Sequence, residues 1–204
     1  MSQSEVVSPE SFLFRVSRVR WLLMPEDCTA AVADQLIARL HALSLAGPEP
    51  VVLEINCARA DFLGALRLFD AIRFHGTPVI GLVNGSAGTG GVIVLQACET
   101  RMATPTSEIL LQPLIAVSFE LPMTLSTTGE NALAAMATQR TITEQMHQHM
   151  LDVLRTRING TVEQVECLIN GARIYVSASD ALKEGLLDVL TGGDEGHLSR
   201  DQGK

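Results

Sequence analysis

No apolar run in this chain of 204 residues extends beyond a few residues, which excludes a membrane-spanning helix. The first ten residues are polar and acidic and lack the basic and then apolar order of a secretory signal, so we expect a cytoplasmic protein. Blocks of like charge are absent too. The net charge of −8 is spread along the sequence, which favours solubility and argues against a nucleic-acid partner.

Cysteine is scarce, with four residues far apart in the sequence: Cys28, Cys57, Cys98 and Cys167. No Cys/His spacing typical of a metal site occurs, so we expect neither a metal nor another cofactor. Three of the four lie in apolar segments and are predicted to be reduced core residues. The length suits one domain: we expect a flexible N-terminus over residues 1–10, a single domain over 11–191 and a disordered polar tail over 192–204.

The stretch from Thr77 to Thr100, TPVIGLVNGSAGTGGVIVLQACET, is the centre of the sequence. Val79 to Val83 is apolar and β-branched and predicts a buried strand, and Val92 to Ala97 predicts a short buried helix. Between them lies a turn with four glycines in seven residues. A glycine turn that leads into a helix directs backbone N–H groups outward and suits an anion or oxyanion. The alternative is close packing of strand and helix without a ligand.

Strand and helix patterns alternate along the rest of the chain, which predicts an α/β fold with a parallel sheet. We expect a hairpin of Phe12–Val16 and Val19–Met24, strands over Val51–Ile55, Ile109–Leu111 and Leu186–Leu190, and a loop over Asn56–Asp61. A helix capped by Asp27 or Thr29 is expected to bury Val32, Leu36, Leu40 and Leu43, and a second helix to bury Phe62, Leu66, Phe69 and Ile72. A long helix is expected over Glu130–Arg157. Ser177 with Asp180, and Thr161 with Gln164, are cap signatures of two short helices.

Two related families resemble this chain. PVIGLVNGSAGTGG followed by VIVLQACE is similar to the signature of the crotonase (enoyl-CoA hydratase/isomerase) family, and CARADF and the ASDAL ending resemble two further motifs of that family. VVLEIN, LFDAIRF, ATPTSEILLQP and YVSASDALKEGLLDVL resemble the Clp protease proteolytic subunit at corresponding spacing. Together the resemblances cover most of residues 19–191. They imply the ClpP/crotonase ββα spiral fold and a homo-oligomer, as a trimer, a hexamer or a ring.

The side chains that both families use in catalysis are replaced here. The resemblance places Thr89 at the protease nucleophile, Leu111 or a deletion beside it at the histidine, and Leu168 or Ile169 at the aspartate, so peptide hydrolysis is not expected. The two crotonase glutamates correspond to Ile93 and Leu114, which leaves ordinary hydration without a general acid and base.

Both families share two main-chain oxyanion donors, which the resemblance places at Ala60 and Gly90. Our main hypothesis is therefore a non-proteolytic crotonase-like enzyme that holds an acyl thioester of coenzyme A or an acyl-carrier protein and stabilises its enolate, for decarboxylation, isomerisation or elimination. Thr89 is a weak nucleophile or a helix cap, and Asp61 orients substrate, acts as a base or caps a helix. The expected substrate contacts are Cys57, Ser86, Gly88, Leu111 and Leu114, although Cys57 also fits a core position and Ser86 a turn.

The second hypothesis is a catalytically inactive Clp protease-like subunit or scaffold in an oligomeric ring. Its long helix and the apolar segment from Leu114 to Leu125 would then serve assembly.

Overall fold

The computed structural model describes residues 16–112, 129–158, 169 and 174–191. The chain separates into two compact units, one made of Met1–Leu111 and Tyr175–Lys204 and the other of Gln112–Ile174. One domain over residues 11–191 therefore stays a prediction, and the terminal segments 1–10 and 192–204 lie outside the described residues.

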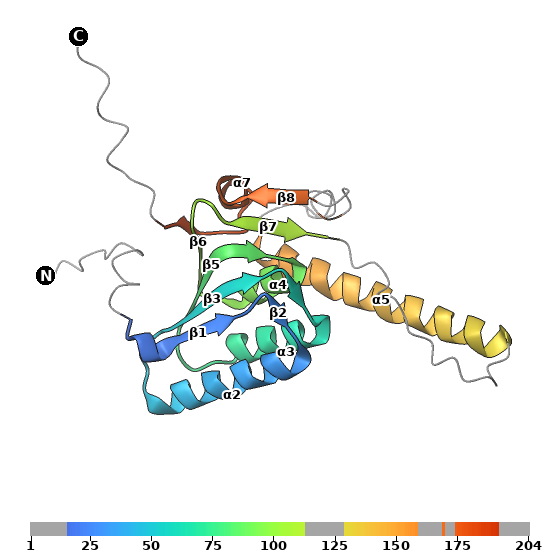
Figure 1. Ribbon diagram of the computed structural model, residues 1–204, viewed down its shortest axis with the longest axis horizontal. Helices are drawn as coiled ribbons and strands as arrows, with labels where there is room; N and C mark the ends of the chain where they lie inside the picture. Colours follow the sequence, from blue (N-terminus) through green and yellow to red (C-terminus); the bar gives the residue numbers. More distant parts are fainter. Residues whose placement is uncertain (1–15, 113–128, 159–168, 170–173, 192–204) are drawn as a thin grey trace, which may run out of the picture. The chain divides into compact units, whose positions relative to one another are not determined.

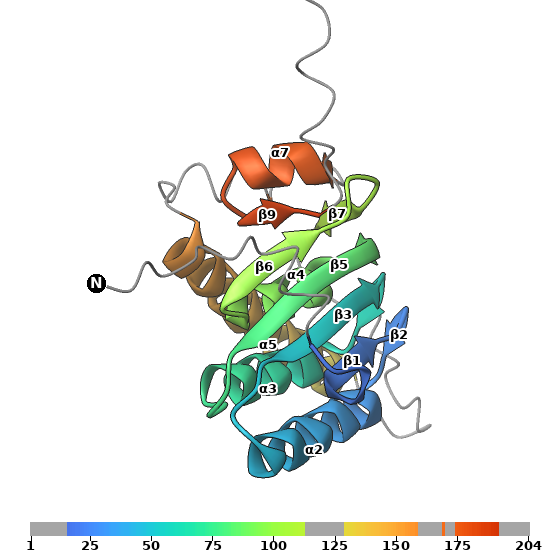
Figure 2. The same cartoon turned by 90° about the vertical axis from the view of Figure 1, so that its left-hand side faces the viewer.

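The first unit is built on a parallel sheet. Its strands are β1 (Trp21–Met24), β3 (Val51–Cys57), β5 (Val79–Ala87), β6 (Thr100–Ala103), β7 (Glu108–Leu111), β8 (Ile174–Ser177) and β9 (Val189–Leu190). The order is β1-β3-β5-β6-β9, with β7 beside the end of β5 and β8 beside β7 (Figures 1 and 2). The pairs β1–β3, β3–β5, β5–β6, β5–β7 and β6–β9 are all parallel. The predicted α/β fold is confirmed.

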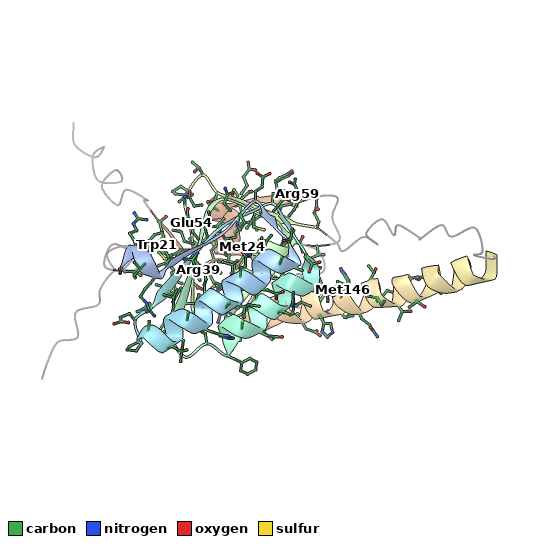
Figure 3. The ribbon with its side chains drawn as sticks, turned by 60° about the horizontal axis from the view of Figure 1, so that its bottom comes forward. Trp21, Met24, Arg39, Glu54, Arg59 and Met146 are labelled. Atoms are coloured by element: carbon green, nitrogen blue, oxygen red, sulfur yellow. The ribbon has the colours of Figure 1, made fainter. Side chains whose placement is uncertain are left out.

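One face of the sheet is covered by the helices α2 (Ala30–Ala46), α3 (Phe62–Arg73) and α4 (Thr89–Ala97) (Figure 1). Met24, labelled in Figure 3, is completely buried, and its register partner is Ile55, which contacts α4 at Gly91. The helices start where caps were predicted: the Thr29 hydroxyl accepts a bond of 3.4 Å from the Val32 amide. Ser177 caps α7 (Ala178–Lys183) in the same way.

The predicted N-terminal hairpin is wrong over its described part. A single 3-10 turn, η1 (Arg18–Arg20), leads directly into β1, and the Arg20 amide donates to the Ser17 carbonyl over 2.8 Å. β1 then pairs in parallel with β3, with Trp21 beside Val52. Residues 12–15, which were to form the first strand, lie outside the described residues.

The structure differs from the predicted elements in three other places. The strand β6 was not predicted, because Thr100 and Arg101 interrupt its apolar pattern. The loop expected over Asn56–Asp61 contains a short strand, β4 (Arg59–Ala60). In α3 the buried face consists of Gly64, Ala65, Leu68 and Ile72, and the larger Phe62, Leu66 and Phe69 are only half-buried. The face begins with a glycine because α2 packs closely against α3 there, with Ala33 next to Gly64.

The second unit contains the predicted long helix, α5 (Gly129–Arg157). Met146, labelled in Figure 3, lies one turn before the completely buried Met150. The cap predicted at Thr161 and the apolar segment from Leu114 lie outside the described residues. Within the described ranges, every helix is too short or too polar to cross a bilayer.

Arg20 is a buried arginine that closes the end of α2. Its guanidinium donates to the carbonyls of Leu43, Gly47 and Pro50 over 3.1 to 3.2 Å, and also to the carbonyl of Glu49. Because the last carbonyls of a helix have no partner within the helix, one side chain here satisfies several acceptors at once.

Replacing Arg20 by alanine is expected to lower the free energy of unfolding by about 3 kcal/mol, since several part-buried carbonyls lose a charged donor. Chemical denaturation followed by circular dichroism measures this change. The matched control is Arg18→Ala, because Arg18 is exposed and stacks on the Trp21 ring at 4.6 Å. Equal losses for the two variants would contradict the assignment.

Candidate functional site

The predicted site lies where β3 and β5 end. The register between these strands shifts between Ile55 and Cys57, so that Cys57 pairs with Ala87. The expected turn at Asn84 is a continuation of β5, which runs to Ala87. The shift in register occurs opposite Gly85, which has a φ of 107°. A Cβ at this position would lie 2.6 Å from the Asn56 side-chain oxygen.

Gly88 joins the end of β5 to α4. Its amide donates to the Cys57 carbonyl over 2.7 Å, and a Cβ on it would lie 2.2 Å from the Ala58 carbonyl oxygen. Gly88 is also the N-cap of α4. Glycine is required at this position because the backbones of two segments approach too closely for any side chain.

The structure brings Ala60 and Gly90 together. A Cβ on Gly90 would lie only 2.6 Å from the Ala60 Cβ. The first main-chain bond within α4 runs from the Val92 amide to the Gly88 carbonyl over 2.9 Å, so the Gly90 amide has no partner within its own helix.

The Ala60 amide belongs to β4, which pairs in parallel with β2 (Asp27–Cys28). The flanking amides of Arg59 and Asp61 donate to the carbonyls of Glu26 and Cys28, over 2.9 and 2.8 Å. Successive amides of a strand point to opposite edges, so the Ala60 amide points away from β2. α4 packs against β4.

Asp61 and Thr89 were each given two roles. The Asp61 carboxylate accepts a bond of 2.6 Å from the Gly64 amide and is the N-cap of α3, as one of the alternatives predicted. Thr89 is not a cap, because α4 begins at this residue and Gly88 holds the N-cap position. The Thr89 residue is half-buried.

Cys57 is a core residue. Its thiol is completely buried and lies 3.1 Å from the Arg59 carbonyl. Burial is the main cause that raises the pKa of Cys57 to about 12, and the neighbouring Cys28 adds to it. The thiolate is the reactive form of cysteine, so this side chain is not a nucleophile at neutral pH.

β7 brings Leu111 toward the same end of the sheet. Ser86 pairs with Glu108 and Ala87 pairs with Ile109, so Leu111 follows two residues beyond the contact with β5. Its side chain is buried, and Ser86 is half-buried. Leu114 and Leu168 lie outside the described residues, and Ile169 is completely buried.

Sequence reasoning missed an ion pair next to Ala60. Arg59, labelled in Figure 3, donates from Nε and Nη2 to the two carboxylate oxygens of Asp27, each over 2.6 Å. The hydrogen bonds from Arg59 lower the pKa of Asp27, and those to Asp27 raise the pKa of Arg59. The two residues are 32 positions apart. No local pattern marks such a pair, because it depends on the unpredicted strands β2 and β4.

Comparison with known proteins distinguishes the two resemblances. A family model described as Clp protease matches residues 8–193. The ATP-dependent Clp protease proteolytic subunit of Deinococcus radiodurans is 24% identical over 177 residues, which are 85% of this chain and 81% of that one. Subunit 2 of Pseudomonas aeruginosa is 26% identical over 96 residues, 46% of this chain and 48% of that one. The solved structure of a ClpP1 mutant from Listeria monocytogenes has a TM-score of 0.72 at 14% identity, covering 84% of this chain and 91% of that one.

These matches overturn the main hypothesis of the sequence analysis. The prediction of an enoyl-CoA hydratase/isomerase-type enzyme acting on an acyl thioester is wrong, and an acyl-CoA or acyl-carrier-protein partner has no support. The glycine turn misled the interpretation because both families share it, whereas the match to the protease extends over almost the whole sequence. The spiral α/β fold predicted from the resemblance is confirmed, and the chain belongs to the Clp protease family.

Proposed function

We propose that this chain is a catalytically inactive Clp protease-type subunit that assembles into an oligomeric ring. The observation that carries the proposal is the buried leucine side chain of Leu111, since the resemblance places the catalytic histidine at Leu111 or at a deletion beside it. A hydroxyl nucleophile needs a neighbouring base to take its proton, and leucine has no group that can do so.

The other two positions support the same conclusion. Thr89 replaces the nucleophilic serine, and the aspartate position falls at Leu168 or Ile169, neither of which can orient a histidine. The glycine turn and β4 retain their close approach at Ala60 and Gly90. We therefore assign to these two amides contact with a carbonyl oxygen of a bound polypeptide, without cleavage.

Assembly is supported by the relatives, both of which are named as subunits of a protease. Sedimentation velocity of the purified chain tests it. We expect a particle several times heavier than the 21.9 kDa of one chain. A monomer at every concentration tested, both alone and mixed with a catalytic Clp subunit, would remove the ring from the proposal.

A further inference from the structure

We infer that the ion pair between Asp27 and Arg59 positions the Ala60 amide beside Gly90; the inference rests on the polypeptide contact that the proposed function assigns to these amides. Arg59 immediately precedes Ala60, and both oxygens of Asp27 accept from its guanidinium over 2.6 Å. A bidentate pair restrains the orientation of the two side chains as well as their distance, because a shift of either strand would distort both hydrogen bonds.

The pair is needed because the bridge between β2 and β4 is short. Each strand has two residues. The Arg59 amide donates to the Glu26 carbonyl, just before β2, and the Asp61 amide donates to the Cys28 carbonyl within it. This two-stranded sheet is separate from the main sheet. Few main-chain bonds therefore hold β4 in place, and the bidentate side-chain clamp adds to this restraint.

The position of β4 determines the spacing at the site. The Ala60 methyl fits against Gly90 with no room for another carbon, so a shift of β4 changes the separation of the two backbones directly. We assign Arg59 and Asp27 no contact with the bound polypeptide. They act through Ala60 as positioning residues.

Removing the clamp by Arg59→Ala is expected to weaken binding of fluorescein-labelled casein about fivefold in fluorescence anisotropy. In Asp27→Ala, which removes the same pair without changing a residue next to Ala60, hydrogen exchange of the Arg59 and Asp61 amides should become faster by a similar factor, and the cross-peak of the Ala60 amide in nitrogen–proton spectra should shift. Asp27→Ala should weaken casein binding to the same extent as Arg59→Ala. The effect should also fade in concentrated salt, because both side chains are mostly exposed.

The matched control is Arg67→Ala, which breaks another mostly exposed pair, with Asp34 at 2.7 Å between α3 and α2. This variant should leave casein binding and the Ala60 signal unchanged. If the unaltered protein does not bind casein, the polypeptide contact of the proposed function is wrong, and the Ala60 signal and amide exchange still decide the role of the clamp. If Asp27→Ala leaves the exchange rates and the Ala60 signal unchanged, the clamp is not a positioning device.

Discussion

Replacing Arg101 by methionine is expected to lower the free energy of unfolding by about 4 kcal/mol. The Arg101 side chain is only 7% exposed, and it holds the Asp188 carboxylate through Nε and Nη2. Its Nη1 donates to the Gln96 side chain over 2.6 Å and to the Gly185 carbonyl over 2.8 Å. Methionine fills a similar volume but leaves a partly buried carboxylate and two acceptors without their charged donor.

The network matters because it joins three parts of the first unit. Gln96 comes from the last turn of α4, Arg101 from β6, and Asp188 immediately precedes β9. The main chain reinforces the connection, since the Asp188 amide donates to the Arg101 carbonyl over 2.8 Å. Losing Arg101 therefore weakens the attachment of β9 to β6 and the attachment of α4 to these two strands.

Guanidinium-induced unfolding followed by circular dichroism measures the effect. Lys183→Met is the control, because Lys183 forms an ion pair of 2.7 Å with Asp180 but is 72% exposed. Exposed pairs contribute little, so this variant should lose less than about 0.5 kcal/mol. A loss below about 1 kcal/mol for Arg101→Met would show that the buried network is not a main contributor to stability.

Replacing Gly90 by alanine is expected to lower the free energy of unfolding by about 2 kcal/mol. Alanine normally stabilises a helix relative to glycine by about 1 kcal/mol, so the sign of the change is itself informative. The loss arises because the new methyl would lie 2.6 Å from the Ala60 Cβ. Either β4 or α4 must move away from the other for both methyl groups to fit.

A double-mutant cycle separates this contact from other effects. Ala60→Gly in the Gly90→Ala background should recover at least about 1 kcal/mol, because the space vacated at one residue accepts the methyl of the other. Gly76→Ala is the control, since Gly76 is exposed and a Cβ there meets only the Ser44 hydroxyl at 3.3 Å. Strictly additive changes at positions 60 and 90 would mean that the two residues are not packed against each other.

Local patterns were sufficient for much of the fold. The caps at Thr29 and Ser177, the strand beginning at Val79 and the long helix ending at Arg157 all follow from residue types a few positions apart. β6 and the β2–β4 bridge were missed, because they are short and mixed in polarity and are held by partners distant in sequence. The contacts of Arg20 and Arg101 depend on the same distant partners, so no sequence window could indicate them.

The site was predictable only in part, and for a related reason. The glycines between β5 and α4 mark a close approach of backbones, and Ala60 and Gly90 do lie together. A close approach does not identify what binds there, since two families with different chemistry share it. The choice between them required the match over residues 8–193.

We propose an assembled Clp-type subunit that does not hydrolyse peptides. The most direct test is to treat the oligomer with a serine-directed fluorophosphonate probe and to measure its turnover of a fluorogenic peptide. A catalytic Clp proteolytic subunit is the positive control. We expect no labelling and no turnover, because the resemblance places Leu111, or a deletion beside it, at the position of the base that Thr89 would need. Labelling at Thr89 or Ser86, with peptide turnover that disappears in Thr89→Ala, would contradict it.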